Sequence, residues 1–356
     1  MNKNNTRFYE IDFLRFVAAV AVVLFHYMYR GFAKGGSSPI SFAPFDQYAQ
    51  YGYLGVHLFF MISGFVILLT AMKRDVSQFV ISRIVRLYPA FWAGVTFSAL
   101  MIVFFGGELF SVSFSQYLSN LSMVDGYLGV KPIDGVYWTL LVEIKFYALI
   151  FALLLFKRVE NIDWFLGAWL AVLVVNIVAP LPKAIQFFLF PEWAPYFISG
   201  AVFFLLKLRG IKAGYLALLA VSYILVLYEI KNEAVLLTDY YSTAFSAVIP
   251  MVVVTLFFLI FGLIIVNKLT FFRSIWAVKI GALTYPLYLI HQNVGYILFN
   301  LFDGLVNKYI LLVAVIAFVL LIAWLIHHLV EKNLGLLMKN LLNQWEYKAK
   351  TLLSWH

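Results

Sequence analysis

The stretch IDFLRFVAAVAVVLFHYMY, residues 11–29, is an apolar run interrupted by one aspartate, one arginine and one histidine. Its length and composition predict a membrane-spanning helix. Arg15 and His26 are eleven positions apart, which at about 100° per residue returns close to the same helix face, roughly 16 Å further along the axis. Ionisable groups inside a span are costly, so this pair is the first candidate for function.

The rest of the chain has the same apolar character. Of its 356 residues, 64% are hydrophobic and 12% are charged, and the mean hydropathy is +0.92. Soluble domains carry roughly a quarter of charged residues. The composition therefore indicates a protein that crosses the membrane many times. There is no cysteine, which excludes disulfides, thiolate metal sites and a catalytic cysteine.

Apolar runs of about 20 residues predict ten spans, forming an all-α helical bundle in a single domain over residues 1–356. The spans are 11–30, 53–72, 88–105, 137–156, 164–180, 185–206, 214–230, 245–266, 277–300 and 309–330. We interpret the first run as a retained span, because Arg15 interrupts the apolar core that a cleavable signal peptide would need.

The basic residues set the predicted orientation. With the N-terminus in the cytoplasm, 18 of the 26 lysines and arginines fall in inside segments and six in outside loops, as the positive-inside rule requires. Both termini are therefore expected in the cytoplasm. Basic inside loops also explain the net charge of +9 without a nucleic-acid partner. The basic amphipathic stretch after Glu331 is expected to be a solvated or interface-lying helix.

Four titratable side chains are predicted at similar depth in the outer half of the membrane: His26, His57, Glu143 and His291. One buried histidine is usually a hydrogen-bonded structural residue. Three imidazoles and a carboxylate at one depth more often line a reaction or transport path. A neutral imidazole at His26 can take the proton of an attacking hydroxyl, and the Glu143 carboxylate can orient that ring.

Asp12 is a second carboxylate near the first span. It lies three residues before Arg15 on the same helix face, so we expect it to pair with that arginine. A metal site is not predicted, because the histidines show no paired ligands at helical spacing. The neighbours His327 and His328 point to different helix faces and are assigned no role.

The predicted inside loop between the second and third spans carries Arg83 and Arg86, three residues apart. On a helical turn they share a face, and guanidinium groups match phosphate oxygens. Taken alone, the pair is better explained by contact of basic inside residues with anionic lipid. Arg15 is predicted near the same membrane surface, which favours a cationic port for a phosphorylated cytoplasmic donor. Ser63, next to Gly64, is expected to serve helix packing, since a nucleophilic serine needs a base at its own depth.

Five segments, in this order, resemble the membrane acyltransferase 3 family of integral-membrane O-acyltransferases. They are Ile11–Arg15 with His26 after ten further residues, Gly55–Phe60 with Ser63–Phe65, Arg83-x-x-Arg86 with Tyr88-Pro89, Trp138–Glu143 with Phe146-Tyr147, and Tyr285–Tyr288 with His291. The chain departs from the family pattern at Thr139, where serine is usual, and at Asn333, where proline is common.

The resemblance implies a multi-pass enzyme of the bacterial inner (plasma) membrane. Members move an acyl group, usually acetyl, from cytoplasmic acyl-CoA to a hydroxyl of an extracytoplasmic or lipid-linked saccharide. By position, Arg15, Arg83 and Arg86 would hold donor phosphates, and His26 with Glu143 would serve the acceptor. Residues expected to support them are Asp12, His57, Ser63, Trp138, Tyr288 and His291.

Acyl-CoA is expected as a donor substrate, with no bound cofactor. We expect a stand-alone form without the fused hydrolase-like domain of some relatives, completing the transfer alone or with a separate extracytoplasmic partner. Threading of the pantetheine arm between helices is favoured over an acyl-enzyme on His26.

Two other functions stay open. A transporter or flippase of lipid-linked saccharide would use the same polar path without acyl-CoA, although it gives no reason for a phosphate port. A purely structural membrane protein would tolerate replacement of His26 and Glu143.

Overall fold

The computed structural model describes residues 7–272 and 274–353. Every regular element in those ranges is a helix, which confirms the predicted all-α class. Nine helical segments within them are long and apolar enough to cross a membrane. They are Tyr9–Ala33, Asp46–Ala71, Val76–Phe105, Gly135–Leu155, Val159–Val178, Lys183–Arg209, Ala213–Tyr241, Val248–Ile265 and Lys308–Lys348.

These nine segments correspond to nine of the ten predicted spans, so the prediction of ten exceeds the described candidates by one. The remaining predicted span, 277–300, lies inside α13 (Ile275–Phe302). That helix is long enough to cross, but a histidine, a glutamine and an asparagine follow one another at 291–293 and make its centre less apolar.

Two helices are longer than the apolar runs that predicted them. α5 (Val76–Phe105) has 30 residues, where residues 88–105 were expected. Thirty residues rise about 45 Å, against about 30 Å of hydrocarbon. Arg83 and Arg86 therefore lie on the first turns of a helix and not in a loop. α11 (Ala213–Tyr241) likewise extends eleven residues past the predicted end at residue 230.

Contacts divide the chain into two compact units whose segments alternate along the sequence. Unit 1 comprises Met1–Phe25, Pro44–Leu69 and Glu160–Thr284, and unit 2 comprises His26–Ala43, Thr70–Val159 and Tyr285–His356. The expectation of a single domain over 1–356 stays a prediction.

Unit 1 is held together by close helix contacts. α10 (Ala194–Arg209) lies against α11 and α12 (Val248–Ile265), and α8 (Ile162–Val178) lies against α11. α4 (Leu54–Ala71) approaches α10 through glycines. A Cβ at Gly64 would lie 2.0 Å from the carbonyl oxygen of Phe197, which favours the packing interpretation of the adjacent Ser63.

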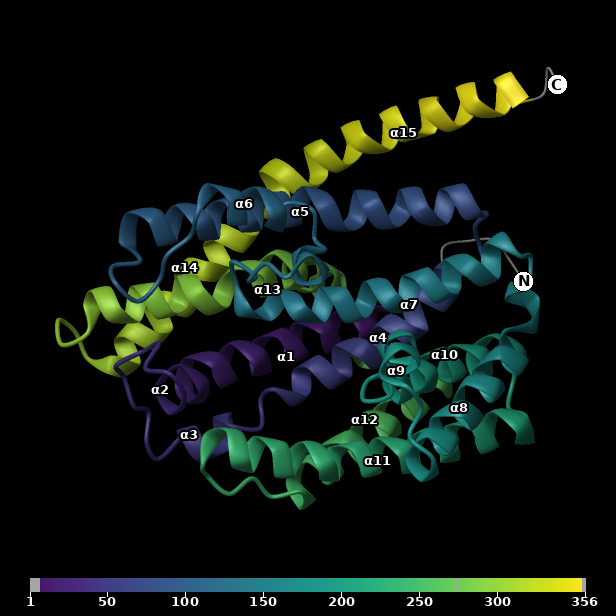
Figure 1. Ribbon diagram of the computed structural model, residues 1–356, viewed down its shortest axis with the longest axis horizontal. Helices are drawn as coiled ribbons and strands as arrows, with labels where there is room; N and C mark the ends of the chain where they lie inside the picture. Colours follow the sequence, from purple (N-terminus) through teal and green to yellow (C-terminus); the bar gives the residue numbers. More distant parts are fainter. Residues whose placement is uncertain (1–6, 273, 354–356) are drawn as a thin grey trace. The chain divides into compact units, whose positions relative to one another are not determined.

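Unit 2 is organised around α5. α7 (Trp138–Leu155) and α6 (Phe114–Asn120) lie against it, and so does the C-terminal helix α15 (Lys332–Leu353), which runs alongside α5 in Figure 1. The expected helix after Glu331 is therefore present.

Two π-helical turns interrupt helices in the described part of the chain. α1 (Tyr9–Phe25) passes into the π-helical turn η1 (His26–Arg30), and α14 (Lys308–Leu325) passes into the π-helical turn η6 (Ile326–Glu331). π-Turns inside α-helices occur frequently at functional sites. His26 is the first residue of one turn, and Glu331 is the last residue of the other.

Candidate active site

Two histidines predicted at the same depth form a buried pair in unit 2. Nε2 of His291, on α13, lies 3.2 Å from Nδ1 of His26. The exposed fractions are 0% for His291 and 7% for His26. The other ring nitrogen of His291, Nδ1, lies 2.8 Å from the carbonyl oxygen of Tyr288. The imidazole of His291 thus bridges its own helix and His26.

These bonds fix which nitrogen carries each proton. A carbonyl oxygen only accepts, so Nδ1 of His291 must be the donor to Tyr288. In neutral His291 the lone pair then lies on Nε2, and Nδ1 of His26 must donate to it. The lone pair of neutral His26 is consequently on Nε2. This is the tautomer that an imidazole needs to accept a proton at Nε2.

The backbone around His291 is held by the segment that precedes α7. Asp134 Oδ2 accepts from the amide of Asn293 at 3.0 Å, and the Tyr137 hydroxyl donates to the carbonyl of Leu289 at 3.1 Å. In a regular α-helix the amide of Asn293 would donate to the carbonyl of Leu289. The Tyr27 hydroxyl donates to the carbonyl of His291 itself at 2.8 Å. Three residues from two segments therefore position this imidazole.

Asp134 is a site residue that sequence reasoning missed. Its side chain is fully buried and also accepts from the amide of Val136. Burial raises the pKa of Asp134 to about 7, and the two amide donors and the charge of Arg30 oppose that rise. The available signal was an acidic residue directly before the start of a helix.

A hydroxyl pair lies one turn from the histidines. The Thr139 and Tyr288 hydroxyls are 2.9 Å apart, and the Thr139 hydroxyl also donates to the carbonyl of Val136. Thr139 therefore preserves the hydroxyl of the serine that is usual at this position. Its neighbour Trp138, the first residue of α7, is 41% exposed.

Glu143 lies near Arg83 and Tyr147. The charged groups of Glu143 and Arg83 both lie near the Tyr147 hydroxyl. The Arg83 guanidinium carbon lies 5.8 Å from the centroid of the Tyr147 ring. The structure gives Nδ1 of His26 the partner His291, and the expectation that Glu143 orients His26 stays a prediction.

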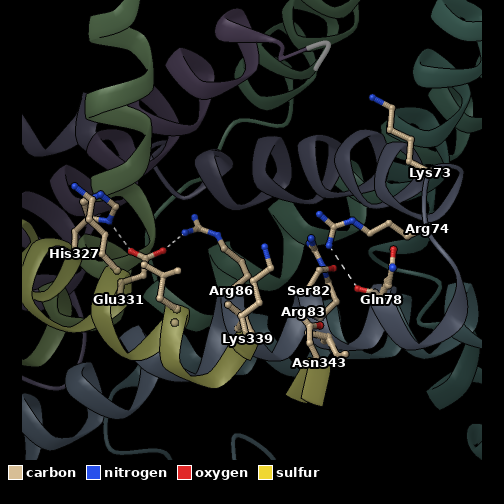
Figure 2. A pocket seen from close by; sticks show the side chains of 15 residues that line it. Lys73, Arg74, Gln78, Ser82, Arg83, Arg86, His327, Glu331, Lys339 and Asn343 are labelled. Carbon is tan, nitrogen blue, oxygen red and sulfur yellow. Dashed lines mark hydrogen bonds and ion pairs between the residues drawn. The ribbon is translucent and has the colours of Figure 1, made fainter. Parts of the chain in front are cut away.

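A cationic pocket of about 750 Å³ lies between α5 and the C-terminal part of the chain. Figure 2 shows basic side chains of α5 and α15 turned toward this space. Its lining residues are Lys73, Arg74, Gln78, Ile81, Ser82, Arg83, Val85, Arg86, His327, Glu331, Lys332, Gly335, Leu336, Lys339 and Asn343. Burial lowers the pKa of Arg74, and the charge of Arg83 lowers it further. The cations of this pocket are thus crowded.

The carboxylate in the pocket lining is already engaged. Glu331 pairs with Arg86 through one oxygen and with Nδ1 of His327 at 2.7 Å through the other (Figure 2). His327, to which the sequence assigned no role, thus belongs to this pocket. The Arg86 guanidinium carbon also lies 5.5 Å from the centroid of the Tyr285 ring.

Helix α13 leads from this pocket to the histidine pair. Tyr285, Tyr288 and His291 follow at three-residue spacing, which brings successive side chains onto one helix face. Tyr285 faces Arg86, Tyr288 bonds with Thr139, and His291 bonds with His26. Six residues rise about 9 Å along a helix axis. The polar series within unit 2 is short enough for one extended substrate to reach from end to end.

Arg15 lies in unit 1 and is not among the residues that line the pocket. Its Nη1 lies 3.7 Å from Oδ1 of Asp12, which confirms the expected pairing. The other oxygen of Asp12 accepts from Arg7 Nε at 2.8 Å. Donor binding by Arg15 stays a prediction, whereas Arg83 and Arg86 do lie together in the pocket.

His57 has a carboxylate partner that the sequence did not predict. Its Nε2 lies 2.9 Å from Oε2 of Glu233, and the imidazole is enclosed by the rings of Tyr53, Trp193 and Tyr196. Glu233 was missed because the predicted seventh span ended at residue 230. In residues 7–272 and 274–353, no three His, Asp or Glu side chains group as ligands of a metal ion would.

Comparison with known proteins places the chain in a family. A family model described as an acyltransferase domain matches residues 8–328. Peptidoglycan O-acetyltransferase OatA of Listeria monocytogenes serovar 1/2a (strain ATCC BAA-679 / EGD-e) is 30% identical over 174 residues, covering 43% of this chain and 25% of that protein. A Bacillus subtilis (strain 168) protein provisionally named peptidoglycan O-acetyltransferase YrhL is 27% identical over 157 residues, covering 38% of this chain and 22% of its own length.

The chain thus matches about a quarter of the length of these two relatives. No solved structure matches it. The family model nevertheless extends over most of the sequence and includes both histidines of the buried pair as well as Arg83 and Arg86. The chain therefore belongs to the membrane acyltransferase 3 family.

Proposed function

We propose that this protein is an O-acyltransferase of the bacterial inner membrane. It takes an acyl group, which we expect to be acetyl, from cytoplasmic acyl-CoA. It delivers the group to a hydroxyl of an extracytoplasmic or lipid-linked saccharide. The membership in an acyltransferase family and the names of two relatives as peptidoglycan O-acetyltransferases support this reaction class.

The observation that carries the proposal is the hydrogen bond between His26 and His291. It keeps the lone pair of neutral His26 on Nε2, as a general base for a hydroxyl requires. His291 is bonded to the carbonyl of Tyr288, so it acts as a positioning residue that holds the His26 ring. In many enzymes a carboxylate accepts from the ring N–H of a catalytic histidine and orients it. In this proposal the imidazole of His291 has that role.

The chemistry follows from this tautomer. Nε2 of His26 takes the proton of the saccharide hydroxyl while its oxygen attacks the thioester carbonyl carbon. A carbon–oxygen bond forms, the carbon–sulfur bond breaks, and the thiolate of CoA leaves. That thiolate takes the proton from His26, which returns to its neutral form. The products are the saccharide ester and the free thiol of CoA.

The cationic pocket supports the donor assignment. Arg83 and the neighbouring lysines and arginines suit the phosphates of the CoA nucleotide. From the Tyr285 ring beside Arg86, α13 rises about 9 Å to His291. A pantetheine arm threading along this series brings the thioester to His26. This route favours direct transfer without a covalent intermediate on the enzyme.

Sealed right-side-out vesicles, loaded with labelled acetyl-CoA, test the proposal. We expect label on outward-facing saccharide with the intact protein and none with His26→Ala, whose CoA binding should be retained. His328→Ala is the matched control, because that histidine bonds to the carbonyl of Trp324 on its own helix, away from the pair. Equal transfer by the His26→Ala protein would refute the role of His26. Transfer that needs no acyl-CoA would refute the donor.

A further inference from the structure

The C-terminal helix α15 begins after residue 328, where the match to the acyltransferase family model ends. It nevertheless supplies one wall of the cationic pocket through Lys332, Lys339 and Asn343. Figure 2 shows Lys339 turned into the same space as Arg83 and Arg86. One wall of the candidate donor site therefore comes from outside the matched region.

Like charges face each other across this pocket. Lys332 and Lys339 stand on α15, opposite Arg83 and Arg86 on α5, and Glu331 is the carboxylate of the lining. Glu331 is engaged by Arg86 and His327. Cations held at close range repel unless an anion lies between them. The space between the two helices is thus built for a multiply charged anion.

A separate set of contacts holds α15 against the start of α5. The Ser77 hydroxyl donates to Glu346, and Lys350 pairs with Glu346 and lies 3.9 Å from Asp75. Lys332, Lys339, Asn343, Glu346 and Lys350 are spaced by three, four or seven residues, so they share one face of α15. At the C-terminal end of α15 this face meets the start of α5 through opposite charges. At the pocket it faces α5 with like charges.

The other face of α15 is apolar and exposed. Leu337, Leu341 and Trp345 lie four residues apart and are 54%, 47% and 75% exposed. Such a face suits the boundary between lipid head groups and acyl chains. The helix thereby has one side for the membrane surface and one side for the pocket.

From this arrangement we infer that α15 is the second half of an anion clamp, and that Lys339 binds a phosphate of the donor nucleotide opposite Arg83. The inference rests on the proposed function, because it takes the nucleotide portion of acyl-CoA as the occupant. Three phosphate groups on that portion match a pocket with cations on both walls. A phosphate of an anionic lipid has the same chemistry, and the test separates the two sources.

The test measures equilibrium binding of CoA and of pantetheine, which lacks the phosphates, to the full chain in phosphatidylcholine nanodiscs. Lys339→Gln should weaken CoA binding about tenfold, as the loss of one charge-assisted hydrogen bond does. Pantetheine binding should not change, and Lys339→Arg should restore CoA binding. Lys348→Gln is the matched control. It lies nine residues on, half a turn round the same helix, and should leave CoA binding unchanged.

Other results would overturn the inference in distinguishable ways. If Arg83→Gln weakens CoA binding and Lys339→Gln does not, the donor site stands and the clamp is refuted. If Lys339→Gln changes only the competition between CoA and phosphatidylglycerol in anionic nanodiscs, the lysine serves lipid. If the intact protein binds no CoA, the donor assignment fails together with the clamp.

Discussion

Each unit buries a histidine whose ring is hydrogen-bonded to a titratable side chain, and the two partners differ in kind. In unit 1, Nε2 of His57 lies 2.9 Å from the carboxylate of Glu233. In unit 2, Nδ1 of His26 lies 3.2 Å from the imidazole of His291. A carboxylate only accepts, so neutral His57 has its proton on Nε2 and its lone pair on Nδ1. Neutral His26 has the opposite tautomer.

The surroundings of the two pairs differ as well. Nδ1 of His57 is buried, has no hydrogen-bond partner among the described residues, and lies in a cage of aromatic rings. The His26 pair continues through Tyr288 and Tyr285 to the cationic pocket. A buried imidazole with a lone pair is thus found in both units. In unit 2, a polar series within the unit connects the imidazole to cations.

The largest effect expected from this comparison is on the rate of transfer. His291→Ala removes the acceptor that fixes the tautomer of His26, and misplacement of a catalytic group costs about a hundredfold in rate. Glu233→Ala removes the corresponding partner of His57 and should leave the rate per folded molecule within about twofold of normal. The measurement is acetyl transfer at saturating and limiting acyl-CoA.

Two readouts separate positioning from simple loss of structure. With His291→Ala, kcat should fall while KM for acyl-CoA stays unchanged, and the pH at which the rate is half-maximal should move. A fall in transfer with Glu233→Ala as large as that with His291→Ala would break the comparison between the units.

The sequence predicted the depth of these residues but not their position around the bundle. Apolar run lengths and the basic loops place His26 and His291 in the same half of the membrane, and the structure does bring them together. The same arguments placed Glu143 at that depth. They carry no information on the direction in which each helix face points. For that reason the expected pairing of Glu143 with His26 stays a prediction.

Helix ends beyond the apolar runs were also hidden from the sequence. Lys231, Asn232 and Glu233 interrupt the apolar run, yet α11 continues to Tyr241 and brings Glu233 to His57. Glu331 lies 245 residues from Arg86 along the chain, and only the packing of the C-terminal segment on α5 unites them. Local patterns do not reveal such pairs. The arginine spacing did predict a shared helix face, and both arginines line one pocket.

An intermediate effect is expected on stability. The His57–Glu233 bond is largely buried, so Glu233→Ala should lower the free energy of unfolding by about 1–3 kcal/mol. Replacing both partners by apolar residues, as in His57→Leu with Glu233→Leu, should recover part of that loss, because no polar group is then left unpaired. Thermal unfolding of the purified protein measures both. A double replacement that is less stable than the single one would contradict the buried pair as described.

A further effect is a pH dependence of stability that belongs to unit 2. Asp134 holds the amide of Asn293 beside His291, and burial raises the pKa of Asp134 to about 7. An unfolded aspartate has a pKa of about 3.9, so between these values the folded state binds more protons than the unfolded state. This contribution to stability is complete below about pH 4 and is lost as the pH rises through about 7.

The unfolding temperature should therefore fall more steeply between about pH 5 and pH 8 in the intact protein than in Asp134→Asn, whose side chain does not titrate. Asp46→Asn is the matched control, because that residue is only half-buried and its carboxylate accepts from the neighbouring Gln47 amide. Equal slopes in the intact protein and Asp134→Asn would show that Asp134 does not hold its proton in the folded state. The support of α13 beside His291 would then rest on an ionised carboxylate.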